Sequence, residues 1–164
     1  MTSGLNTAAA WRLERVHHVG ITVSDIEQSI AFYRDMLGMT LVRRRPRVDA
    51  GYVASQTGFP GVQLSVASLQ THNGGPSIEL AQYLNQQGEP LAAATNQPGS
   101  CHLCLVVSDL SACHADLKTK GVEFKSEPVS ITEGPNKGGL VVYLRDPDGY
   151  TIELFEPPLS AGEK

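Results

Sequence analysis

Four residues with metal-binding side chains stand at equivalent places in the two halves of this chain. His18 and His102 each precede a Val-Ser-Asp tripeptide by the same interval, and Glu79 and Glu153 each stand in an Ile-Glu-Leu tripeptide. Two halves related by a pseudo-twofold axis would bring these two imidazoles and two carboxylates together. Because imidazole and carboxylate ligands suit Zn, Ni, Co, Mn and Fe(II), we expect one divalent metal ion per site.

Such a ligand set would also support catalysis. Four protein ligands on an octahedral ion leave two positions open, and an open position is typical of a catalytic metal site. A substrate with two neighbouring oxygens can fill both positions, and the metal then acts as a Lewis acid that stabilises an enediolate or enolate. A glutamate that loosens from the metal can move the α-proton, so Glu153 and Glu79 are the candidate catalytic residues.

The elements that must position these residues repeat in the order βαβββ, which predicts an α+β fold of paired modules. In each half a strand leads into a helix that is capped by a serine, Ser24 or Ser108, and that is followed by a glycine. The stretch between residues 45 and 62 is expected to be irregular. Hydrophobic periodicity predicts strands near residues 15–23, 39–45, 62–68 and 76–83, and again near 101–107, 122–126, 139–144 and 150–156.

The repeat also defines the domain organisation. Each module alone is too short to bury a good core, so the two are expected to share one. The expected parts are an N-terminal arm 1–14, a single domain 15–157 made of modules 15–84 and 100–157 with a connector 85–99, and a C-terminal tail 158–164.

Strand alternation places the four predicted ligands on one face of the sheets. Period two puts Thr22 on the face of His18, Tyr83 on the face of Glu79, and Phe155 on the face of Glu153. The opposite faces are expected to pack under the helices, because their residues are aliphatic: Val19, Ile21, Val23, Ile78, Leu80, Leu103, Leu105, Ile152 and Leu154.

The other histidines are expected to lie away from the metal. His17 adjoins His18 and would point to the opposite face. His114 falls on the second helix, where we expect it to be exposed.

Composition and charge narrow the partners and the compartment. The chain has 164 residues, a net charge of −4 and a pI near 5.7, which argues against general nucleic-acid binding. No apolar run approaches the roughly 20 residues that a membrane span needs. The arm lacks a signal-peptide core, so we expect a cytoplasmic protein that binds neither nucleic acid nor membrane. Three cysteines make no disulfide framework, and Cys101 and Cys104 are expected to be structural.

Three motifs give the chain a resemblance to a known family. The opening HVGITVSD, the segment SIEL and the run RDPDGYTIEL resemble the vicinal oxygen chelate superfamily, which includes glyoxalase I, methylmalonyl-CoA epimerase, extradiol dioxygenases and bleomycin resistance proteins. The resemblance spans about residues 15–157, and its ligand pattern is closest to glyoxalase I-like proteins. It implies that each module forms a half-barrel cup and that a divalent metal lies between two modules. The ligands that it implies are His18, Glu79, His102 and Glu153.

The same resemblance implies a homodimer, as do the open sheet edges that each half-barrel leaves. The metal site would then lie either within one chain or between two. The implied activity is that of a metal-dependent lyase or isomerase of the glyoxalase I type, acting on a small molecule. An Fe(II)-dependent extradiol-type dioxygenase and a resistance protein that sequesters a small molecule are the alternatives.

Two departures from the family pattern bear on the substrate. Glyoxalase I holds glutathione through an Arg and an Asn at the places where this chain has Thr22 and Tyr83, which argues against glutathione. Residues 51–66 contain no acid that would serve as the second base of a methylmalonyl-CoA epimerase. We expect the substrate to be contacted by Thr22, Tyr83, Phe155 and Lys137. Lys137 lies in the glycine-rich loop TEGPNKGG, which resembles a mobile loop of glyoxalases and would act as a lid.

A basic run occupies the loop after the second predicted strand: Arg43, Arg44, Arg45 and Arg47. Our first interpretation is a solvated edge strand, whose charge prevents pairing with another chain. The second is a clamp for an anionic substrate tail.

Overall fold

The computed structural model describes residues 11–91 and 93–159, so parts of the predicted arm and tail lie outside the described residues. The first module contains two helices and a π-helical turn η1, and the second contains one helix. The elements of the first are β1 (His18–Thr22), α1 (Ile26–Ala31), η1 (Phe32–Met36), β2 (Thr40–Val48), α2 (Gly51–Thr57), β3 (Leu64–Gln70) and β4 (Ser77–Tyr83). Those of the second are β5 (His102–Val106), α3 (Leu110–Thr119), β6 (Val129–Ser130), β7 (Leu140–Arg145) and β8 (Thr151–Glu156).

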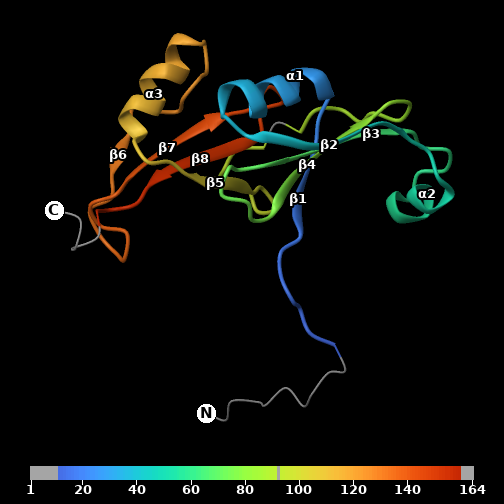
Figure 1. Cartoon of the computed structure of the whole chain (residues 1–164), viewed down its shortest axis with the longest axis horizontal. Coiled ribbons are helices and arrows are strands. Elements are labelled where there is room, and N and C mark those ends of the chain that lie inside the picture. The colour runs from blue at the N-terminus through green and yellow to red at the C-terminus, as the bar shows by residue number, and fades with distance from the viewer. Residues whose placement is uncertain (1–10, 92, 160–164) are drawn as a thin grey trace.

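Each module folds into a four-stranded sheet with the same topology, which confirms the predicted α+β fold of paired βαβββ modules. The strand orders are β1-β4-β3-β2 and β5-β8-β7-β6. In both sheets the first strand pairs in parallel with the last strand of its module, and the remaining pairs are antiparallel. Helices α1 and α3 lie on the same side of the two sheets, while α2 lies at the far end of the first sheet (Figure 1).

The helices begin one residue later than the sequence predicted. Asp25 caps α1, accepting hydrogen bonds from the backbone N of Glu27 at 2.9 Å and of Gln28 at 3.0 Å, and Asp109 caps α3 in the same way. The serine caps were therefore wrong. An ionised carboxylate is favoured at a helix N-terminus because it accepts orphan N–H groups and faces the positive end of the helix dipole.

Two further local predictions were wrong. The stretch expected to be irregular contains α2, which ends at Gly58 with a φ of 76°. A left-handed glycine is a common helix stop. The strand expected at 122–126 is reduced to a single bridge between Phe124 and Leu144. Val122 and Phe124 still pack against the core, so the alternation that predicted a strand reflects burial without a hydrogen-bonded ladder.

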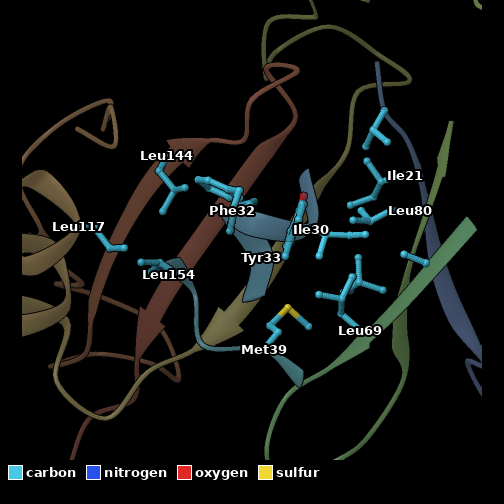
Figure 2. Close-up of a cluster of buried hydrophobic side chains, with 14 of the residues drawn as sticks. Ile21, Ile30, Phe32, Tyr33, Met39, Leu69, Leu80, Leu117, Leu144 and Leu154 are labelled. Atoms are coloured by element: carbon cyan, nitrogen blue, oxygen red, sulfur yellow. The ribbon is translucent and has the colours of Figure 1, made fainter. Parts of the chain in front are cut away.

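The predicted aliphatic faces form one core that both modules share. Ile21, Ile78, Leu80, Ile152 and Leu154 are buried, and the remaining members of that set are buried or packed against the cluster, which confirms the prediction. Figure 2 shows the labelled side chains of the second module on one side of the α1–η1 segment. Those of β1, β3 and β4 of the first module lie on the other side. Neither module therefore has a complete core alone.

His114 belongs to this core, contrary to the prediction that it is exposed. Its relative exposure is 6%, and its ring lies 4.3 Å from that of Phe124. The Nδ1 atom stands 3.6 Å from Glu127 Oε2. The ring is buried within the second module against Phe124, so we assign His114 a structural role.

The turn between β7 and β8 fastens the second module to the first. The Tyr33 hydroxyl donates a hydrogen bond to Asp146 Oδ2 at 3.0 Å, and the backbone N of Ser24 donates to Asp148 Oδ2 at 2.9 Å. Asp146 Oδ1 also accepts from the backbone N of Asp148 and of Tyr150. Burial raises the pKa of Asp146 above its usual range, although these three donors act in the opposite direction.

We predict that Tyr33→Phe lowers the free energy of unfolding by about 1–3 kcal/mol, because the buried Asp146 carboxylate loses one of its donors. Urea titration followed by circular dichroism measures this change. Tyr150→Phe is the matched control, since its hydroxyl meets only Cys101 Sγ at 3.5 Å near the surface. Equal losses in the two variants would contradict the importance of the Tyr33–Asp146 bond.

Candidate metal centre

The four predicted ligands lie on the sheet faces that point away from α1 and α3, which we call the open faces. The open face of the first sheet carries His18, Gly20, Thr22, Leu64, Val66, Ser68, Ser77, Glu79, Ala81 and Tyr83. The open face of the second sheet carries His102, Cys104, Val106, Val141, Tyr143, Thr151, Glu153 and Phe155. Alternation along each strand and pairing across strands fix these assignments.

Each open face brings together one histidine and one glutamate. His18 Nε2 lies 3.7 Å from Glu79 Oε1, and His102 Nε2 lies 2.9 Å from Glu153 Oε2. The two pairs have the same register. His18 pairs with Ser77, two residues before Glu79, and His102 pairs with Thr151, two residues before Glu153. The local geometry of the repeat is thus equivalent in both modules.

The four side chains do not form one cluster within a single chain. In residues 11–91 and 93–159, no three His, Cys, Asp or Glu side chains gather closely enough to hold a metal ion. Two ligands at right angles on an ion, with bonds of about 2.0–2.2 Å, lie about 3 Å apart. The spacing of each His–Glu pair therefore suits half of a four-ligand site.

His17 supports the ring of His18, which differs from the prediction that it points to the opposite face. It precedes β1, where strand alternation no longer applies, and its Nδ1 lies 2.7 Å from Nδ1 of His18. This contact occupies Nδ1 and leaves Nε2, which faces Glu79, as the ring atom available to a metal. A partner on the second ring nitrogen is the usual way in which a metal-binding histidine is oriented.

Tyr143 and Cys104 surround Glu153 on the second open face. Both stand directly across from Glu153 on the neighbouring strands, and the Tyr143 ring lies 5.4 Å from that of His102. Burial, together with the Glu153 charge, raises the pKa of Cys104 to about 11 and raises that of Tyr143 as well. Both groups are therefore protonated at neutral pH and can donate toward the carboxylate.

Sequence reasoning missed both neighbours of Glu153. Cys104 is predicted to be structural, yet it is a free, exposed thiol on the open face. The signal that identifies Tyr143 is the alternation of β7, but it becomes useful only when the register with β8 is known.

The residues predicted to contact substrate occupy four different settings. Thr22 ends β1 and is exposed. Tyr83 packs edge-on against Phe59 beyond α2, with ring centroids 5.7 Å apart. Phe155 lies beside Gly139, where a Cβ would stand 3.1 Å from its ring and 2.6 Å from the carbonyl oxygen of Glu156, and the backbone contact makes this position require glycine. Lys137 is exposed in a turn closed by the hydrogen bond from Gly138 N to Ile131 O.

A cavity of about 320 Å³ lies between the modules beneath the connector. It includes Thr22 but none of the four predicted ligands. Two charged residues in its lining already have partners: Asp148 accepts from Ser24 N, and Arg145 donates to the carbonyl oxygens of Gly149 and Ala93. The cavity borders the open faces through Gly20, Thr22 and Thr151, but the four predicted ligands lie outside it.

Comparison with known proteins identifies the family. Residues 15–154 match the model of the glyoxalase/bleomycin resistance protein/dioxygenase superfamily, and the chain belongs to it. It is 30% identical over 145 residues to lactoylglutathione lyase of Salmonella typhimurium, covering 87% of this chain and 92% of that protein. It is 28% identical over 151 residues to mitochondrial methylmalonyl-CoA epimerase of Homo sapiens, covering 90% and 77%.

Solved structures agree on the fold. A glyoxalase family protein from Bacillus cereus superposes with a TM-score of 0.80 at 25% identity, covering 93% of this chain and 99% of that one. The chain is 29% identical over 145 residues to lactoylglutathione lyase GLX1 of Arabidopsis thaliana. The match covers 87% of this chain but only 44% of that longer protein. Within the part of the chain that the structure describes, every helix is too short or too polar to cross a membrane.

We predict that Glu153→Gln accelerates alkylation of Cys104 several-fold in metal-free protein at pH 8. The pKa of Cys104 is about 11, so little thiolate is present at pH 8. Removing the negative charge of Glu153 lowers this pKa and increases the fraction of thiolate, which is the reactive form. Mass spectrometry after brief iodoacetamide treatment measures the labelling. Glu123→Gln removes the same charge elsewhere in the module and serves as the control; an unchanged rate in Glu153→Gln would place this carboxylate away from the thiol.

Proposed function

We propose that this protein is a divalent-metal-dependent lyase or isomerase of the glyoxalase I type, which moves an α-proton of a small substrate. The observation that carries the proposal is the pair of equivalent His–Glu sets, His18–Glu79 and His102–Glu153, on the two open faces. The family supports it, because relatives are named as lyases and epimerases and members generally bind a divalent metal.

We further propose that the metal site is shared between two copies of the chain. His18 and Glu79 of one copy would meet His102 and Glu153 of the other, since one chain offers only half-sets. The open faces support this arrangement, because Val106 on the second is 67% exposed although it is aliphatic. Family members commonly form dimers. A twofold dimer would contain two equivalent sites.

The bound metal ion and Glu153 would have separate roles in the reaction. When bound, the divalent ion supplies Lewis acidity that stabilises negative charge on the substrate oxygens. Glu153 is the better placed base, because its side chain is 19% exposed compared with 38% for Glu79, and Tyr143 lies beside it. Glu153 would take the proton from the carbon next to the carbonyl, and either that proton or one exchanged with solvent would return to that carbon or to its neighbour.

The substrate is small and differs from glutathione conjugates. Thr22 is a short side chain, and Tyr83 is held against Phe59. Neither can supply the cationic and amide contacts expected for glutathione. Phe155 would provide an apolar wall, and Lys137 would lie on a turn that closes over it.

We predict that Glu153→Gln lowers the rate of proton exchange by about 10²–10⁴-fold, as expected for the loss of a positioned base. Dihydroxyacetone in deuterated water, followed by proton NMR, is the probe, and the metal content is measured by mass spectrometry on the same samples. Glu123→Gln, which removes the same charge outside the open faces and outside the glycine-rich loop, is the control. Oxygen consumption in place of proton exchange would favour the extradiol-type alternative, and binding without either reaction would favour a sequestering protein.

The shared site makes a separate prediction about mixed dimers. His18→Ala homodimers and Glu153→Ala homodimers each lack every complete site. In a mixed dimer, the intact first sheet of the Glu153→Ala chain meets the intact second sheet of the His18→Ala chain, so one of the two sites is restored. Unfolding and refolding the two variants together should recover metal binding and exchange.

A site within one chain predicts no recovery in the mixed dimer. Refolding His18→Ala with Glu79→Ala is the matched control, since both lesions lie on the first sheet and no complete site can form. Sedimentation at low micromolar concentration first establishes the dimer; a monomer of 17.6 kDa would contradict the shared site.

A further inference from the structure

Two arginines on β2, Arg43 and Arg45, face the open side of the first sheet. Arg44 donates to Glu27 Oε1 at 2.7 Å and to the carbonyl oxygen of Val66, and Arg47 donates to Asp49 at 2.8 Å. Among the described residues, Arg43 and Arg45 have no ion pair and no side-chain hydrogen bond, and both are exposed. Arg44 and Arg47 are therefore held by other residues of the chain, whereas Arg43 and Arg45 are available to a ligand.

A β-bulge at Val42 determines which arginines face outward. Leu41 pairs with Leu69 and Arg43 pairs with Ser68, so β2 advances by two residues while β3 advances by one. Leu41 lies on the helix side, where it packs against the core. Without the bulge, Arg43 and Arg45 would follow Leu41 to that side. With it, they lie on the open face, and Arg44 turns toward α1.

The two arginines lie in the same rows as the first His–Glu pair. Arg43 pairs with Ser68, which pairs with Glu79; Arg45 pairs with Val66, which pairs with Ala81. Two strand spacings separate the backbone of β2 from that of β4, roughly 10 Å. An extended arginine side chain reaches across part of this distance. Between them, Ser68 and Ala81 are small, whereas Val66 packs against the α2 cluster.

We propose that Arg43 and Arg45 bind an anionic group, a carboxylate or a phosphate, carried by the substrate a few bonds from its two neighbouring oxygens. This inference rests on the proposed function, since it places the oxygens at the His–Glu sets. Guanidinium groups suit the role because they bind carboxylate and phosphate through paired, charge-assisted hydrogen bonds. The chain has a net charge of −4, so the attraction is local to this face.

Protection of the sheet edge does not account for this placement. Charge on an edge strand discourages pairing whichever face it points to. The described residues also supply carboxylates for Arg44 and Arg47 but none for the two residues that share the face of Glu79.

The test compares charged and uncharged substrates in the same exchange reaction. Dihydroxyacetone, dihydroxyacetone phosphate and 5-hydroxy-4-oxopentanoate share the hydroxyketone, and the last two add a phosphate or a carboxylate. We expect Arg43→Gln/Arg45→Gln to raise KM for one or both anionic probes by on the order of tenfold per arginine. KM for dihydroxyacetone should stay the same. Arg47→Gln, which removes the same charge from the same strand, should change none of them.

A binding measurement keeps this inference separate from the proposed function. Chelator-treated protein is titrated with inorganic phosphate and with succinate by calorimetry, at low and at high salt. Weak binding that the double variant abolishes and that salt diminishes supports the anion site even if no probe undergoes exchange. The inference is overturned if wild-type protein binds neither anion and the double variant turns over all three probes like wild type.

Discussion

The turn formed by Asp146, Pro147, Asp148 and Gly149 is the constraint on which the arrangement of the two modules depends. Its two carboxylates reach out of the second module, Asp146 to the Tyr33 hydroxyl and Asp148 to the backbone of Ser24. A buried carboxylate is costly unless it is hydrogen-bonded, and Asp146 accepts from two backbone groups as well. The modules can satisfy these bonds only when their helix sides face a common core.

That constraint leaves the part of each open face that carries the His–Glu pair accessible to solvent. The apolar side of each sheet is consumed by the shared core, so the opposite sides are available to a substrate or to another chain. Each carries one histidine and one glutamate in the same register, which is the structural expression of the sequence repeat. Because each sheet holds half of a four-ligand set, the proposed chemistry depends on how two open faces meet.

The two open faces differ in chemistry although their topology is the same. Around Glu79 the neighbouring strands present Gly20 and Ser68, whereas around Glu153 they present Cys104 and Tyr143. The first face ends in a bulged, arginine-rich edge and is covered at one end by α2. The second has an aliphatic and aromatic row through Val106 and Phe155. Two such faces would give a proposed site with one cationic side and one apolar side, which suits an asymmetric substrate.

The sequence by itself determined the repeated module, the strands that carry the four candidate ligands, and the aliphatic faces, because these depend on periodicity and on spacing along the chain. The resemblance in its motifs also identified the family. Tertiary structure decided what depends on register and on contacts between distant segments. The bulge at Val42 reversed the directions of Arg43 and Arg44, and the pairing of β7 with β8 brought Tyr143 to Glu153. His114 is buried in the second module, where its ring packs against that of Phe124. Periodicity indicates which residues share a face of one strand, but the partner strand determines what that face meets, and partners are set by packing over the whole chain.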